Sequence, residues 1–232
     1  MDDQKIIFFL VIRPNHFVLH AINEKFELLQ NEESFFNDQD IKNNLDALKK
    51  FLDKNIFEIE KKFSLYIEDI YLIIDDENFI SIDISLIKDF KNLSTIIDNN
   101  LIDLSNIKNN VLKSNIDFQL AHMTINRFIV NKKDYLIIPD QINVKNLYLE
   151  LRFICFRTRT FLNIEKILSK YQISIKKVLS YKYVDSFKTD EIDNISLVAN
   201  KLINGFNKNE IHFKKKYPKN IGFFEKFFKF FS

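Results

Sequence analysis

The four histidines are the residues best suited to acid–base chemistry or metal binding, but their spacing favours neither. They are His16, His20, His122 and His212, and none belongs to the H-E-x-x-H pattern that places two zinc ligands on one helix face. His16 and His20 share a face of a predicted strand, where no third ligand is evident. The single cysteine, Cys155, lies in an apolar run without a neighbouring base, which indicates a buried structural thiol. We therefore predict no catalytic residue and no metal site.

Glycine is the scarcest residue that bears on cofactor binding. The chain has only two, Gly205 and Gly222, and neither has another glycine near it. Loops that cradle phosphates need residues that accept positive φ and allow the backbone to approach the ligand closely. Neither a P-loop nor a G-x-G-x-x-G motif is present. The sequence therefore predicts no bound nucleotide and no other cofactor.

Charge is distributed unevenly along the chain. Residues 201–232 contain eight lysines and two glutamates, whereas the first 200 residues contain 26 basic and 30 acidic side chains. An acidic body with a basic end argues against a nucleic-acid groove spread over the fold. It favours a basic tail that meets an anionic surface.

The last dozen residues have the pattern of an amphipathic membrane helix. On a helical wheel with ~100° per residue, the large apolar side chains of residues 221–231 all fall on one half. Partial burial of the phenylalanine rings in the membrane is favourable, whereas ordering the helix costs conformational entropy. The net free energy of membrane binding should be a few kcal/mol, so binding should be reversible. The alternative is a helix that docks on the protein's own core. The predicted membrane-binding residues are apolar (Ile221, Phe223, Phe224, Phe227, Phe228, Phe230 and Phe231) and basic (Lys214, Lys215, Lys216, Lys219, Lys226 and Lys229).

The rest of the chain alternates between strand-like and helical patterns, which predicts an α/β fold. Strands are expected within 5–36, at 69–74 and 79–86, within 118–157 and at 173–181. A long helix is expected at 40–63, where apolar residues recur every three or four positions with Asp40 as a possible N-cap. Shorter helices are expected at 103–114, 163–171, 184–187 and 192–203.

The order of these elements resembles the bacterial actin-like cell-division protein FtsA. The stretches that carry the resemblance are Ile6–Phe17, the helix 40–63 with the strand 67–74, the segments 121–130, 138–139, 147–156 and 163–181, and the terminal Ile221–Phe231. The match covers most of this chain, but only about the N-terminal half of a typical family member plus its extreme end. It implies a partial actin-like (ribonuclease-H-like) lobe at 1–78, a strand-helix-strand-strand subdomain at 79–187, a connecting helix at 188–203, a basic linker at 204–220 and an amphipathic membrane helix at 221–232.

Two departures from the family bear on function. Actin-like proteins carry an Asp and a Gly in the turn after the first strand, for the nucleotide phosphate and metal, whereas Val11 and Arg13 stand at those positions here. After Phe187 the second phosphate loop is missing, and so is the lobe that holds the tail peptide of the ring protein FtsZ. Nucleotide binding is therefore not expected.

We accordingly expect a non-catalytic, membrane-peripheral adaptor in bacterial cell division, on the cytoplasmic face of the inner membrane at the division site. The resemblance implies anionic membrane lipids and other cell-division proteins as partners, with self-association, and no nucleic acid. One alternative is an ATP-binding actin-like protein that completes its site with a partner chain. Another is a nucleic-acid binder that uses Lys208–Lys219, for which Tyr217 among those lysines is thin support for base stacking.

Overall fold

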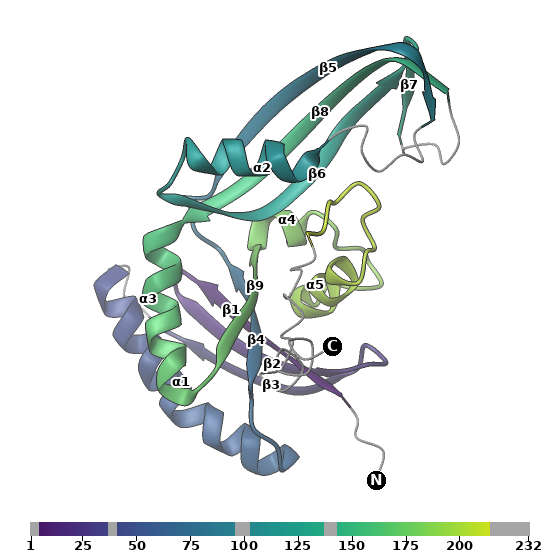
Figure 1. Cartoon of the computed structure of the whole chain (residues 1–232). Coiled ribbons are helices and arrows are strands. Elements are labelled where there is room, and N and C mark those ends of the chain that lie inside the picture. Colours follow the sequence, from purple (N-terminus) through teal and green to yellow (C-terminus); the bar gives the residue numbers. More distant parts are fainter. Residues whose placement is uncertain (1–4, 37–40, 96–102, 137–142, 214–232) are drawn as a thin grey trace, which may run out of the picture.

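The chain folds into two β-sheets stacked end to end, each covered by helices (Figure 1). This computed structural model describes residues 5–36, 41–95, 103–136 and 143–213, with the backbone alone for 41–44 and 91–95. The predicted membrane-binding residues, 214–231, lie outside the described residues, as does Asp40. In the described part of the chain, no helix is both long and apolar enough to cross a membrane.

The first sheet has five strands in the order β3-β2-β1-β4-β9. β1, β2 and β3 pair antiparallel, and β1, β4 and β9 pair parallel. This order, three antiparallel strands followed by two parallel ones, is that of a ribonuclease-H-like lobe, and it confirms the predicted α/β class and its actin-like lobe. The strands are β1 (Ile6–Arg13), β2 (His16–Asn23), β3 (Leu28–Phe35), β4 (Asp69–Ile74) and β9 (Ser174–Ser180).

Helices cover both faces of this sheet, which explains why β1 is apolar from Ile6 to Ile12. α1 (Ile41–Phe63) and α3 (Thr158–Leu168) pack on one face, and a 3₁₀ turn (Ser169–Tyr171) leads from α3 into β9. α4 (Tyr181–Asp185) and α5 (Ile195–Ile203) pack on the other face. Alternate β1 residues therefore enter different cores: Leu10 contacts the α1 side, and Phe9 contacts the α5 side.

The second sheet is antiparallel and has the order β5-β8-β6-β7. Its strands are β5 (Ile80–Thr95), β6 (Phe118–Val130), β7 (Lys133–Tyr135) and β8 (Asn143–Arg157), and α2 (Leu104–Lys113) covers one face. Asp103 caps α2 by accepting a hydrogen bond from the Asn106 amide at 2.9 Å. The β6–β7 hairpin turns at Asn131 and Lys132, both with positive φ.

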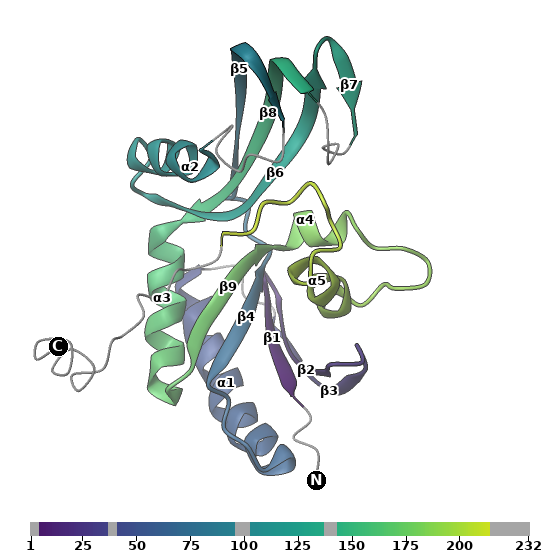
Figure 2. The ribbon, with the colours of Figure 1, turned by 45° about the vertical axis from the view of Figure 1, so that its right-hand side comes forward.

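The observed boundaries differ from the predicted ones in two places. α3, β9 and α4, assigned from sequence to the second subdomain, pack instead on the first sheet. The residues that follow α5, expected to begin a linker at 204, run between the two sheets as far as residue 213 (Figure 2). This segment, Asn207–Phe213, is called the C-terminal strap below.

Candidate functional site at the junction of the sheets

The C-terminal strap adds a short extended segment to β6. The Ile125 amide donates to the Asn209 carbonyl at 2.9 Å, and the Ile211 amide donates to the Met123 carbonyl at 2.8 Å. Thr124 and Glu210 face each other in this antiparallel bridge. β6 carries irregularities in its pairing with β8 on both sides of this point, between Leu120 and His122 and between Ile125 and Arg127. The strap therefore lies where β6 bends over the first sheet.

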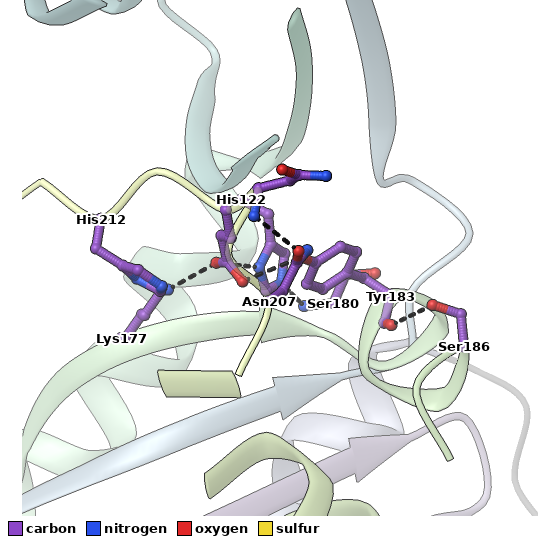
Figure 3. A network of polar contacts seen from close by, with 9 residues as sticks. His122, Lys177, Ser180, Tyr183, Ser186, Asn207 and His212 are labelled. Atoms are coloured by element: carbon purple, nitrogen blue, oxygen red, sulfur yellow. Dashed lines mark hydrogen bonds and ion pairs between the residues drawn. The ribbon is translucent and has the colours of Figure 1, made fainter. Parts of the chain in front are cut away.

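Glu210 is buried and is the centre of a polar network between the sheets. Figure 3 shows His122, Lys177, Tyr183 and Asn207 of this network. The Glu210 carboxylate accepts hydrogen bonds from His122 Nδ1 at 3.0 Å, from Lys177 Nζ at 3.1 Å and from the Tyr183 hydroxyl at 3.0 Å. The Asn207 amide group donates to the same Tyr183 hydroxyl at 2.9 Å. Because His122 comes from β6, Lys177 from β9, Tyr183 from α4 and Glu210 from the strap, one carboxylate joins four elements.

The hydrogen bonds of His122 determine its tautomer. The Ser180 amide donates to His122 Nε2 at 3.0 Å, so Nε2 must offer a lone pair and the ring proton must be on Nδ1. Nδ1 then donates to Glu210, and both nitrogens are satisfied in the neutral ring. A second proton would place two N–H groups against each other. Burial lowers the pKa of His122, which is consistent with a permanently neutral imidazole.

Glu210 is ionised in this site. Burial alone would raise its pKa, but the hydrogen bond from His122 and the charge of Lys177 outweigh burial and lower the pKa to about 2. Burial and the carboxylate together raise the pKa of Tyr183, so the phenol remains a donor. His212, whose Nδ1 lies 3.5 Å from Lys177 Nζ, has its pKa lowered by burial and by that ammonium.

This arrangement can hold the chain but is unsuited to proton transfer. A general base needs a free nitrogen that a substrate can reach, and His122 has neither a free nitrogen nor an exposed surface. The network instead ties Glu210, four positions before Lys214, to the joint between the two sheets. The strap is therefore a fixed attachment point for the residues that follow it.

A second candidate site is the edge of the first sheet at the carboxyl ends of β1, β4 and β9, where open α/β sheets bind ligands. Here the Arg13 Nε atom lies 3.5 Å from Asp75 Oδ2, and the Arg13 guanidinium stacks 4.7 Å from the centre of the Tyr181 ring. Val11, where actin-like proteins have an acidic residue, is 1% exposed in the core on the α5 side. An ion pair and an aromatic ring therefore lie at this edge of the first sheet.

The remaining chemistry-bearing residues are separate. His16 pairs with Glu33 at 3.2 Å, while His20 is buried beside Ser196 at 2.7 Å. Burial raises the pKa of Cys155 to about 11, which fits the predicted inert thiol. No group of three His, Cys, Asp or Glu side chains among the described residues could hold a metal ion.

The sequence offered little signal for the junction site. His122 and Glu210 are 88 residues apart, and Glu210 stood within a segment whose polar composition predicted a linker. A glutamate followed by the apolar residues Ile211 and Phe213, in an otherwise lysine-rich segment, was the only local indication.

No protein-family model matches this sequence, and no curated protein matches it. Three solved structures have partly similar backbones. The PilM-PilN type IV pilus biogenesis complex is 9% identical, with 78% of this chain and 49% of that chain covered and a TM-score of 0.49. The cytoplasmic domain of EpsL, an inner membrane component of the type II secretion system of Vibrio cholerae, is 8% identical, with 81% and 59% covered and a TM-score of 0.35. A protein of unknown function with an actin-like ATPase fold from Bacteroides thetaiotaomicron is 11% identical, with 78% and 55% covered and a TM-score of 0.33.

The chain thus spans between 49% and 59% of the length of these structures. The likenesses concern the backbone alone and carry no information about activity or partners.

Proposed function

We propose that this protein is a membrane-peripheral adaptor without catalytic activity of its own. The observation that carries the proposal is the attachment of the strap. The buried Glu210 network holds the chain at the junction of the sheets, and a lysine-rich, phenylalanine-rich tail begins at Lys214, directly after the strap.

The end of the strap also contacts the second sheet. Ile211 and Phe213 pack against the core of that sheet, and the Lys108 ammonium lies 4.4 Å from the centre of the Phe213 ring. A tail bound to lipid would therefore hold the second sheet, including α2, close to the membrane surface. The adaptor would present this sheet and its exposed edge to other proteins at the bilayer.

Our proposal that the protein has no catalytic activity of its own rests on the geometry of the two sites described above. At the carboxyl edge of the first sheet, Arg13 is held by Asp75 and Tyr181, and at the junction both nitrogens of His122 are already bonded. Titration of the chain with Mg·ATP in a calorimeter should give no heat of binding at micromolar protein. Micromolar affinity would favour the alternative of an actin-like nucleotide binder.

Vesicle cosedimentation tests the membrane role. The full chain should pellet with vesicles that contain anionic lipid, and a chain with both Phe227→Glu and Phe228→Glu should stay in the supernatant. The matched control is Lys226→Glu with Lys229→Glu, which changes the polar half of the same helix. This control should reduce pelleting with anionic vesicles in a salt-dependent way, because it removes charge attraction but keeps the apolar face. Equal pelleting of wild type and the Phe variant would contradict the proposal and would favour a tail that docks on the protein itself.

We further propose that the assembly it serves is the cell-division machinery, with cell-division proteins as partners on the cytoplasmic face of the inner membrane. The order of elements that resembles FtsA supports this finer assignment. A fluorescent fusion should concentrate at midcell. Uniform membrane fluorescence would agree with a membrane-peripheral adaptor but contradict the role in cell division. Cytosolic fluorescence would contradict both proposals.

A further inference from the structure

β5 is an edge strand whose apolar side chains are only partly covered. Within the described residues it pairs with β8 alone. Ile80, Ile82, Ile84 and Leu86 face the same core as α2, yet all four remain half-buried. The β8 residues opposite them, Cys155, Phe153, Leu151 and Leu149, are at most 1% exposed. The difference follows from the number of neighbours, since β8 has a strand on each side and β5 has one.

The other sheet edges carry features that discourage pairing with another chain. β7 is three residues long, β3 carries Glu32 and Glu33, and β9 carries Lys176 and Lys177. β5 has no such protection over Ile80–Ile87. Its pairing with β8 is regular from Ile80 to Asp89. The one charged residue between Ile80 and Ile87, Asp83, is paired with Arg152 through hydrogen bonds of 2.8 and 3.0 Å.

We propose that β5 is a dimerisation edge, on which β5 of a second copy of this chain pairs antiparallel about a two-fold axis at Ile84. A two-fold axis perpendicular to the sheet places even-numbered residues opposite even-numbered ones and keeps them on the α2 face. Ile84 then lies opposite Ile84 of the second copy, and Ile82 lies opposite Leu86. On the other face, Asp83 lies opposite Ser85.

The neighbouring registers are less favourable. An axis at Asp83 places two carboxylates directly opposite each other, which is destabilising. An axis at Ser85 places Ile82 opposite Lys88 and Asp83 opposite Ile87, which is 76% exposed. Among these three registers, the one centred on Ile84 places Ile82 opposite Leu86 and brings no two carboxylates together.

A groove beside β5 can accept part of the second strand. Leu86, Ile87 and Lys88 of β5 line it together with Leu147 and residues of α2, including Ile107, and it encloses about 250 Å³. In the proposed register, Ile82 of the second copy lies opposite Leu86, at the side of this groove. The paired segments are short, so the contact is smaller than the ~1,600 Å² of a standard interface and the dimer should dissociate on dilution.

Dimerisation would have a consequence at the membrane, which rests on the proposed function. Two tails in one dimer convert the second membrane contact into an intramolecular step, so that two weak anchors hold far more firmly than one. The pairing itself is independent of lipid and is tested in its absence.

The first experiment uses disulfide crosslinking of the full chain in lipid-free buffer. In Ile84→Cys the two thiols belong to residues directly opposite each other, with Cα atoms ~5 Å apart, which a disulfide can span. In the control Ile82→Cys the two equivalent residues are ~13 Å apart along the strands, beyond reach. Cys155 is buried and does not compete. We expect a crosslinked dimer from Ile84→Cys alone under mild oxidation. Absence of crosslinking in both variants, or equal crosslinking in both, would overturn the proposal.

The second experiment uses the exposed Ser85, whose substitution leaves the core intact. Ser85→Asp places a carboxylate opposite Asp83 in both halves of the dimer, and Ser85→Lys places an ammonium there. Sedimentation equilibrium should show a several-fold higher dimer Kd for Ser85→Asp than for Ser85→Lys, with wild type between them. A wild-type chain that stays monomeric at hundreds of micromolar, or two variants with equal Kd values, would overturn the proposal. Because no lipid is present, failure here leaves the membrane role untouched.

Discussion

The substitution Glu210→Gln tests the junction network most directly, because glutamine keeps the shape of the side chain and removes its charge. The pKa of Glu210 is lowered from 4.5 to about 2 in the folded chain. A pKa difference of that size corresponds to at most about 3 kcal/mol of stabilisation at pH 7, at ~1.4 kcal/mol per unit, because a neutral His122 contributes its hydrogen bond but no charge. Since the neutral amide resembles the protonated acid, Glu210→Gln should lower the free energy of unfolding by up to about 3 kcal/mol at pH 7.

The loss should depend on pH in a defined direction. A carboxyl group with a lowered folded-state pKa stabilises the fold above its unfolded-state pKa and loses that effect as the pH falls through the folded-state value. The difference between wild type and Glu210→Gln should therefore be constant from pH 7 to about 5, and should shrink from about pH 4.5 toward pH 2. The groups that face the carboxylate, His122, Lys177 and Tyr183, are the same in both proteins.

Urea denaturation between pH 7 and pH 3 measures this difference, with Glu191→Gln as the control because Glu191 is exposed in the loop before α5. Hydrogen exchange gives a local measure, since the Ile211 amide, bonded to the Met123 carbonyl at 2.8 Å, should lose protection in Glu210→Gln if the strap is released. Equal unfolding midpoints at pH 7, or a difference that persists undiminished at pH 3, would refute the account of a charged, strap-holding carboxylate.

Three further outcomes are expected. Burial lowers the pKa of His20 from 6.5 to about 4, so the unfolded chain takes up the proton first as the pH falls. The free energy of unfolding of wild type should therefore fall by up to about 3 kcal/mol between those pH values. The urea midpoint of His20→Gln should depend less steeply on pH, and the same dependence in both proteins would contradict this. Phe26 has φ of +63° in the β2–β3 turn, so Phe26→Gly should raise the free energy of unfolding by about 1 kcal/mol in thermal melts, and a lower melting temperature would count against strain there. Phe153 is fully buried in the second sheet, so Phe153→Ala should cost about 3–5 kcal/mol in urea unfolding, and a loss below about 1 kcal/mol would show that this sheet is not tightly packed.

Sequence periodicity was sufficient for elements that bury one face along their whole length. α1 repeats apolar residues every three or four positions, and the structure places Leu48, Leu52, Ile56 and Ile59 in the core, as that spacing predicts. The start of α3 was predicted five residues too late. β8 runs directly into the helix at Thr158, whose amide bonds to the Asp117 carbonyl at 2.8 Å, and a contact over 41 positions leaves no local sequence signal.

By itself, the sequence determined the approximate positions of most helices and strands, the α/β class, the shortage of phosphate-binding loops and the amphipathic pattern of residues 221–231, because these depend on the order of neighbouring residues. Only the tertiary structure decided that α3 and β9 join the first sheet, that β5 is left at an edge, and that Glu210 lies buried against His122, Lys177 and Tyr183. A buried charge is tolerated only where several donors converge on it, and here those donors come from β6, β9 and α4, between 27 and 88 positions from Glu210. That convergence is a property of the folded backbone, which no local pattern of residue types encodes.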